Sequence, residues 1–258
     1  MSENGYQINV SRDDFSKLLL LLGVFENTCT DCDIKGGKFR CKSNDRHALI
    51  EMDLSTILQD HDLSFSLIKN KVALMRSFEL DENIQIEDKT VIIESNDSNY
   101  EICDPFSRVI FRKPAARYID NQFIPDEEFA SLVRISEDNL LFTTNVNNYM
   151  KKRISNLSLG FETDQIHCNI AEGKAEFVVR RDNKEDTSTV IKDITMNRDV
   201  GSKHFKINSL PFTLDIAADL KIDCYTTSQN DVYLCKFTQT FFGIVITILA
   251  QVKVSNVS

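Results

Sequence analysis

Cysteine and histidine residues near the start of the chain are the first candidates for chemistry. Cys29 and Cys32 are separated by two residues, and Cys41 and His47 follow within a short stretch. Zinc favours such ligands, but the spacing from Cys32 to Cys41 and the Gly-Gly turn between them fit no common zinc motif. We therefore expect no metal and interpret Cys29, Cys32 and Cys41 as buried or strand-edge thiols, although metal binding is left open.

The sequence carries no recognisable catalytic signature. The four histidines lie far apart in the sequence and none occurs in paired helical spacing, so structural or surface roles are favoured for His47, His61, His167 and His204. There is no Gly-rich phosphate loop with a lysine, no His-Glu-x-x-His and no Gly-x-Ser-x-Gly. We predict that the chain is not an enzyme and needs no cofactor.

Length and charge limit the class of protein. The 258 residues suffice for two domains of ordinary size, and 42% hydrophobic and 27% charged residues are typical of a globular protein. No apolar run is long enough for a membrane span, and the start resembles no secretory signal. With an odd number of cysteines, seven, these features predict an intracellular, reduced protein. A net charge of −9 argues against a wholly basic nucleic-acid surface but allows a local basic face.

One order of predicted elements occurs twice along the chain. Each half begins with a strand, continues into a helix and then a hairpin, and goes on with short strands rich in Ile, Val and Phe. Each half holds a second, shorter helix, so the fold class is α+β with antiparallel sheets. The four helices are predicted at about Arg12 to Leu22, Lys69 to Phe78, Val146 to Leu159, and weakly after Ser209-Leu210-Pro211.

Three of the four predicted helices carry Lys or Arg on the side away from their apolar face. In the third helix, periodicity places an apolar face at Val146, Tyr149, Met150, Ile154 and Leu157. This assignment predicts that Lys151 and Lys152 face outward, with Arg153 nearer the apolar side. Between the halves, residues 112–126 show no clear period and are bracketed by prolines, which is typical of a connector.

At this point the chain resembles a known family. The order strand, helix, hairpin, strands, basic helix, strands, connector, and then the same again, is similar to DNA sliding clamps with two domains per subunit, such as proliferating cell nuclear antigen and the clamps of T4-like phages. The most local similarities are the strand and basic helix from Asp62 to Phe78, the run Arg108-Val-Ile-Phe-Arg112, and the final strand Phe242 to Ala250. The resemblance covers nearly the whole chain, although none of these motifs is highly specific.

The resemblance implies a homotrimeric ring of six similar domains around double-stranded DNA. Helices would line the hole and contact phosphates without reading bases, which explains basic helices in an acidic protein. The alternative is that these cations are only the solvated sides of amphipathic helices. The residues implied in DNA contact are Arg12, Lys17, Lys69, Lys71, Arg76, Lys151 and Lys152.

The resemblance also implies protein contacts. Subunits would join by pairing edge strands, one from residues 108–113 and one from residues 187–195, with Arg108, Ile110 and Arg112 facing Thr189, Ile191 and Asp193 of a neighbour. Short peptides of the DNA polymerase and the clamp loader would enter an apolar pocket at the connector. Its expected residues are Leu49, Tyr118, Ile119, Ile248, Leu249 and Ala250. The alternatives are that both strands are interior ones and that the connector only closes onto its own sheet.

These points predict a polymerase processivity factor with domains at 1–113 and 127–258 and a connector at 114–126. The alternative is a β-rich viral structural or adaptor protein that does not bind DNA, and a hydrolase with a dispersed site is a distant third. We expect the protein to act inside cells, in the host cytoplasm if it is viral and in the nucleus if it is eukaryotic. No membrane contact is expected.

Overall fold

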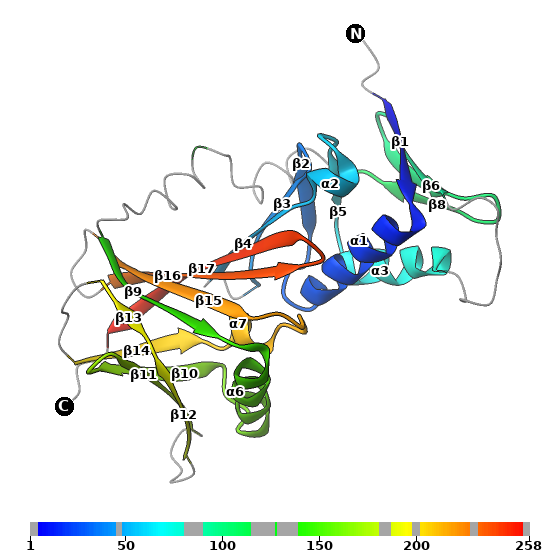
Figure 1. Ribbon diagram of the computed structural model, residues 1–258. Coiled ribbons are helices and arrows are strands. Elements are labelled where there is room, and N and C mark those ends of the chain that lie inside the picture. Colours follow the sequence, from blue (N-terminus) through cyan, green and yellow to red (C-terminus); the bar gives the residue numbers. More distant parts are fainter. Residues whose placement is uncertain are drawn as a thin grey trace. The chain divides into compact units, whose positions relative to one another are not determined.

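The computed structural model of the chain describes residues 5–44, 48–79, 90–114, 127, 139–180, 187–197, 202–227 and 232–254. The chain forms two compact units (Figure 1). The first comprises residues 1–44 with 50–124, and the second comprises 45–49 with 125–258. The sequence pattern also predicts strands at 83–86 and 132–135, and these segments and most of the connector lie outside the described residues.

The first unit follows the predicted order, with a strand and a long helix before a set of short strands. Its helical segments are α1 (Arg12–Phe25), α2 (Ser55–Leu58), α3 (Ile68–Met75) and the short 3₁₀ segment η1 (Arg76–Phe78). Its strands are β1 (Tyr6–Ser11), β2 (Cys32–Lys35), β3 (Lys38–Lys42), β4 (Ala48–Asp53), β5 (Leu63–Phe65), β6 (Thr90–Ser95), β7 (Asn99–Cys103) and β8 (Arg108–Arg112).

The second unit repeats this order. The helices for which bounds are described are α6 (Asn148–Gly160) and α7 (Leu210–Thr213), at the positions of α1 and α3 in the first unit. Its strands are β9 (Leu140–Val146), β10 (Gln165–Ala171), β11 (Lys174–Arg180), β12 (Thr187–Asp193), β13 (Thr195–Met196), β14 (Lys203–Asn208), β15 (Leu220–Thr226), β16 (Val232–Phe241) and β17 (Ile244–Val254). The predicted duplication and the α+β class with antiparallel sheets are therefore confirmed.

Two antiparallel sheets and the long helix build the first unit. One sheet has the order β1-β6-β7-β8, and the other strands pair in the order β4-β3-β2-β5. Helix α1 contacts β1, β6, α2 and α3, and its buried side chains include Phe15, Leu18, Leu22 and Phe25. Burial of these large apolar groups is the main stabilising contribution to this unit.

In the second unit the described strands run in the order β12-β11-β10-β14-β17-β16-β15-β9-β13. The pairing of β14 with β17 is short, with only Phe205–Val254 and Lys206–Lys253 in register. It joins the strands β12-β11-β10-β14 to the strands β17-β16-β15-β9-β13. Helix α6 packs against α7, β11 and β12. The strands pair over long antiparallel registers, such as ten residue pairs from Val232–Lys253 to Phe241–Ile244 between β16 and β17.

The two long helices begin in the same way. The Ser11 side chain accepts a hydrogen bond from the Asp14 N–H, and the Asn147 side chain accepts one from the Met150 N–H. Such caps satisfy one of the free N–H groups at a helix start and contribute about 1 kcal/mol. The cap at Asn147 fixes the first turn of α6, so the helix presents Tyr149 on its exposed side. None of the described helices is both long enough and apolar enough to cross a bilayer.

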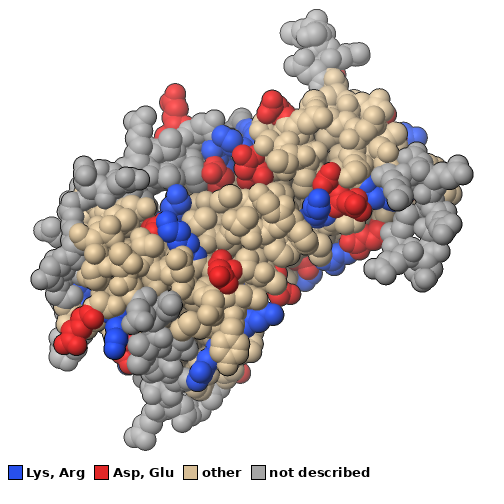
Figure 2. Space-filling model, in the orientation of Figure 1, with Lys and Arg blue, Asp and Glu red and all other residues tan. Residues whose placement is uncertain are grey.

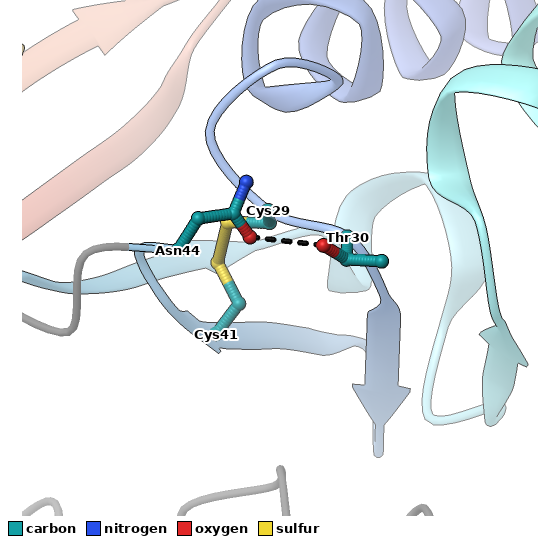
Figure 3. The surroundings of a disulfide bond; sticks show 4 residues. All are labelled: Cys29, Thr30, Cys41 and Asn44. Carbon is teal, nitrogen blue, oxygen red and sulfur yellow. Dashed lines mark hydrogen bonds between the residues drawn. A yellow bond between two sulfur atoms is a disulfide. The ribbon is translucent and has the colours of Figure 1, made fainter.

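Two of the cysteines first considered as separate thiols are joined in the structure. Cys29, in the turn after α1, forms a disulfide with Cys41 on β3 (Figure 3). Beside it, the Thr30 hydroxyl donates to Asn44 Oδ1 at 3.0 Å, and the Asn44 N–H donates to the Thr28 carbonyl. The interpretation of Cys29 and Cys41 as thiols is therefore wrong, because β3 brings Cys41 back to the end of the helix. Cys32 is a buried free thiol whose pKa is raised by burial.

Candidate nucleic-acid interface

Arg12 opens α1 but does not face open solvent. Its Nη2 atom lies 2.7 Å from Asp104 Oδ2, its Nη1 donates to the Phe78 carbonyl at 3.0 Å, and its side chain is 13% exposed. Burial opposes ionisation of Asp104, but the Arg12 hydrogen bond and the N–H groups of Phe106 and Ser107 lower the pKa of this carboxyl group. Arg12 is thus engaged in an ion pair within the first unit, which contradicts its predicted role as an outward cation.

The other predicted cations of the first unit are more exposed, and each has a local partner. Lys17 pairs with Asp14 at 2.8 Å one turn before it, and Lys69 Nζ donates to Asn27 Oδ1 at 3.3 Å. Lys71 Nζ lies 5.1 Å from the centre of the Phe111 ring, and Arg76 lies 3.8 Å from Glu26. Because Asp14 and Glu26 offset two of these charges, the helices of this unit are only weakly basic.

Helix α6 buries a different face from the one predicted. Its buried side chains are Lys151, Ile154 and Ser158, whereas Tyr149 is 75% exposed. Lys151 is 2% exposed, and its ammonium donates to the Ile216 carbonyl at 2.7 Å and to Gln239 Oε1 at 2.9 Å. Burial lowers the pKa of Lys151 to about 8. The prediction that Lys151 faces solvent and contacts DNA is therefore wrong, because two distant acceptors allow its burial.

Lys152 and Arg153 lie on the exposed side of α6. In the part of the chain that the structure describes, neither has an ion-pair partner. No Asp or Glu occurs between Asn148 and Gly160, so the helix itself does not offset these charges. Sequence periodicity had assigned Arg153 to the apolar side. The signal that identifies Arg153 is the run Lys-Lys-Arg in a helix without acids, once Lys151 is known to lie on the buried face.

The other described helix of the second unit adds no positive charge. Helix α7 has only four residues, Leu-Pro-Phe-Thr, and none is charged. On the face shown in Figure 2, side chains of both signs are interspersed, with no continuous area of one sign. Of the described helices, α6 therefore offers the strongest basic surface in an otherwise acidic chain.

The two strands predicted to join subunits are both edge strands among those described. Strand β8 ends the order β1-β6-β7-β8, and β12 ends the order in the second unit. Arg108, Ile110 and Arg112 are exposed along β8, with Ile110 at 54%, and Arg108 pairs with Glu101. The side chains of Thr189, Ile191 and Asp193 lie outside the described residues.

Hydrogen bonding shows which side of β8 is open. The Asp104 N–H donates to the Ser107 carbonyl, and the Lys113 N–H donates to the Ser98 carbonyl. Glu101 is opposite Ile110 in this antiparallel register. Since bonded and non-bonded pairs alternate along such a ladder, the Ile110 N–H and C=O point away from β7. Among the described residues, no strand pairs with this side of β8, so the Ile110 backbone groups point outward at the edge of its sheet.

The residues of the predicted peptide pocket cannot be assembled from the described side chains. Ile248, Leu249 and Ala250 are buried on β17, and Leu49 on β4 is half-buried. Tyr118 and Ile119 lie outside the described residues. The pocket therefore stays a prediction.

The histidines that the structure describes are in structural settings. His61 stacks on Tyr6 with ring centres 4.4 Å apart. His167 Nδ1 lies 3.0 Å from His204 Nε2, and Arg180 Nε donates to His167 Nε2 at 3.1 Å. His204 Nδ1 contacts Asn169 Oδ1, and Asn169 Nδ2 donates to Glu176 at 2.8 Å. Burial, together with the Arg180 and Lys206 charges, lowers the pKa of His204. His47 lies outside the described residues, and among the described ones no group of three potential ligands could hold a metal.

The fold, with two units of the same element order, is that of the DNA sliding clamps, as comparison with solved structures shows. The chain is similar to the proliferating cell nuclear antigen of Thermococcus kodakaraensis, with a TM-score of 0.62 and 11% identity over 95% of this chain and 99% of that one. It is equally similar to the A. fulgidus protein bound to the C-terminal region of FEN-1, with a TM-score of 0.60 and 10% identity over 98% and 99% of the two chains.

Bacterial clamps give a similar result. The H. pylori beta clamp in complex with 5-chloroisatin matches with a TM-score of 0.61 and 13% identity, over the whole of this chain and 67% of that chain. No model of a known protein family matches the sequence, and no curated protein matches it. At such low identity the likeness shows the fold, and the function has to be argued from the site.

Proposed function

We propose that this chain is the subunit of a sliding clamp that encircles duplex DNA and tethers a DNA polymerase. The main support is the extent of the structural likeness, since clamp chains are matched over 95% or more of this chain and nearly their whole length. Tethering raises the effective concentration of the polymerase at the primer end without any catalysis by the clamp. This role agrees with the lack of a catalytic motif in the sequence.

The charge distribution indicates which surface of the protein would face DNA. Lys152 and Arg153 are exposed on α6, a helix that contains no acidic residue, and they would contact phosphates without reading bases. Lys69, Lys71 and Arg76 would contribute less, because neighbouring groups already engage them. The subunits would close a homotrimer through β8 and β12, and a clamp loader would open the ring. The site of action would be inside the cell, in the host cytoplasm of a virus or in a eukaryotic nucleus.

Charge reversal on α6 tests this function. We expect the double variant Lys152→Glu/Arg153→Glu to reduce long products of primer extension about tenfold or more, because repulsion replaces phosphate contacts. The assay uses the polymerase and loader from the same source at physiological salt. The matched control is Lys42→Glu/Lys174→Glu, which makes the same charge change at exposed strand positions and should leave synthesis unchanged. Normal processivity of the α6 variant, with its fold intact, would contradict the proposal.

The same experiment distinguishes the proposed clamp from the alternative function, an adaptor or structural protein. A β-rich adaptor or structural protein without DNA binding would suit the balanced charges of the first unit. Such a protein would neither increase polymerase processivity nor respond differently to the two double variants. Stimulation that depends on Lys152 and Arg153 would exclude it.

Peptide capture is the second part of the proposed function. The A. fulgidus clamp is bound by the C-terminal region of FEN-1, and we expect the C-terminal peptide of the cognate polymerase to bind this chain with roughly micromolar affinity, about 8 kcal/mol. Ile119→Asp should weaken binding in calorimetry by placing a charge in an apolar groove. The melting temperature and native mass should not change, and Ile119→Leu serves as the control. Unaltered binding by the Asp variant would show that Ile119 does not contact the peptide.

A further inference from the structure

An aromatic side chain lies on the exposed face of α6, in the first turn of the helix. Tyr149 is 75% exposed, and Arg153 and Asn156 follow it at i+4 and i+7, which places the three on one line along the helix. This line is opposite the buried Lys151, Ile154 and Ser158. Lys152 flanks the line. The exposed stripe of α6, defined here as Tyr149, Lys152, Arg153 and Asn156, therefore combines an aromatic ring, two cations and an amide.

The composition of this stripe discriminates between forms of DNA. A duplex keeps the faces of its bases stacked inside, so a protein ring on its outside reaches the backbone and the base edges but not those faces. A single strand exposes its base faces, and stacking on an aromatic side chain contributes about 1–3 kcal/mol per base. Phosphates of the same strand are attracted by neighbouring Lys and Arg side chains. An exposed tyrosine beside two cations therefore suits an unpaired strand better than a duplex.

The start of the helix does not provide an alternative anion site. The Asn148 N–H donates to Asp219 Oδ1 at 2.8 Å, and the Met150 N–H donates to the Asn147 side chain at 2.9 Å. The first turn is thus occupied by side chains of this chain, one of them acidic. A phosphate would therefore bind at Lys152 and Arg153, one turn further along the helix. The exposed ring of Tyr149 remains accessible to an uncharged group.

We propose that the exposed stripe of α6 binds single-stranded DNA, with a base stacked on Tyr149 and the adjoining phosphates on Lys152 and Arg153. The proposal rests on the proposed function, because it assumes that α6 faces DNA. It assigns to the clamp a contact with the unpaired template beside the primer end, in addition to its sequence-independent hold on the duplex.

The test compares two variants of Tyr149 on two DNA probes. Binding of a fluorescein-labelled oligothymidylate and of a hairpin duplex is measured by anisotropy at low salt with the full chain. Tyr149→Leu should weaken oligothymidylate binding about tenfold while leaving duplex binding within about twofold, because leucine cannot stack as an aromatic ring does. Tyr149→Phe keeps the ring and should bind both probes as the wild type does. Leu159→Ser, at another exposed apolar position of the same helix, is the surface control and should change neither.

Other outcomes would overturn the proposal in distinguishable ways. If Tyr149→Leu binds oligothymidylate normally while Lys152→Glu/Arg153→Glu does not, there is no stacking and the proposed function survives. If Tyr149→Phe is as weak as Tyr149→Leu, the hydroxyl group makes the contact and the stacking proposal is wrong. If neither the tyrosine variants nor the charge reversal alters binding to either probe, α6 does not face DNA and the proposed DNA-binding surface fails as well.

Discussion

Ile110→Pro is expected to reduce the native mass from near three times 29.5 kDa to that of a single subunit. Proline removes the N–H of residue 110, which points away from β7 and is free to pair with another strand. The loss of this donor at the centre of a short edge strand should disrupt pairing with β12 of a neighbour. Native mass spectrometry or light scattering at micromolar concentration measures the result.

The orientation of this N–H makes the experiment specific. Since residue 110 makes no backbone hydrogen bond to β7 in this register, the variant should keep the β1-β6-β7-β8 sheet and its thermal transition. Ile110→Ala is the matched control, because it removes the exposed side chain but retains the N–H, and most of the assembly should survive. A wild-type chain that is strictly monomeric, or an Ile110→Pro variant of unchanged mass, would contradict the edge-strand interface.

Lys151→Met is expected to change how stability depends on pH. The pKa of Lys151 is lowered to about 8 in the folded chain, against about 10.4 for an unfolded lysine. Between these values the folded chain has released a proton that the unfolded chain still holds, so the contribution of Lys151 to the free energy of unfolding rises with pH. From pH 7 to 9.5, the wild type should gain on the order of 1 to 2 kcal/mol relative to the variant.

Urea unfolding of both proteins at several pH values in this range measures the difference. Buried Cys168 and Cys224, whose pKa values are raised, make stability fall as pH rises, but they are present in both proteins and cancel. Lys152→Met is the control, since it removes an exposed lysine one position away and should not alter the pH dependence. Parallel curves for wild type and Lys151→Met would show that the lysine is not held in the buried, charge-disfavouring site described.

The architecture was predictable because it depends on local patterns that occur twice. The helix predicted at about Arg12 to Leu22 corresponds to α1, and the Gly-Gly turn indicated the β2–β3 hairpin. The short helix α2 and the strand β7 were missed, because Ser55–Leu58 is too short for helical periodicity and Asn99–Cys103 begins with turn-forming residues. The order of elements, together with the resemblance to clamps, was enough to identify the fold.

The site was less predictable because it depends on contacts between distant segments. Burial of Lys151 requires acceptors at Ile216 and Gln239, and no window around α6 contains either of them. The ion pair of Arg12 likewise depends on Asp104, far along the chain. Periodicity assumes that charged side chains face water, and both residues are exceptions because their partners are supplied by tertiary structure.

A network of side-chain hydrogen bonds runs from Arg180 through His167, His204 and Asn169 to Glu176. In each of these bonds the donor and the acceptor are fixed. A guanidinium group can only donate and a carboxylate can only accept, so one tautomer of each imidazole fits between them. The residues come from β11, β10 and β14, and the side chains therefore tie these strands together at defined positions. A slip of one strand by a single residue would turn its members of the chain to the opposite face. The network therefore favours a single register of β10, β11 and β14 in the sheet whose edge strand is β12.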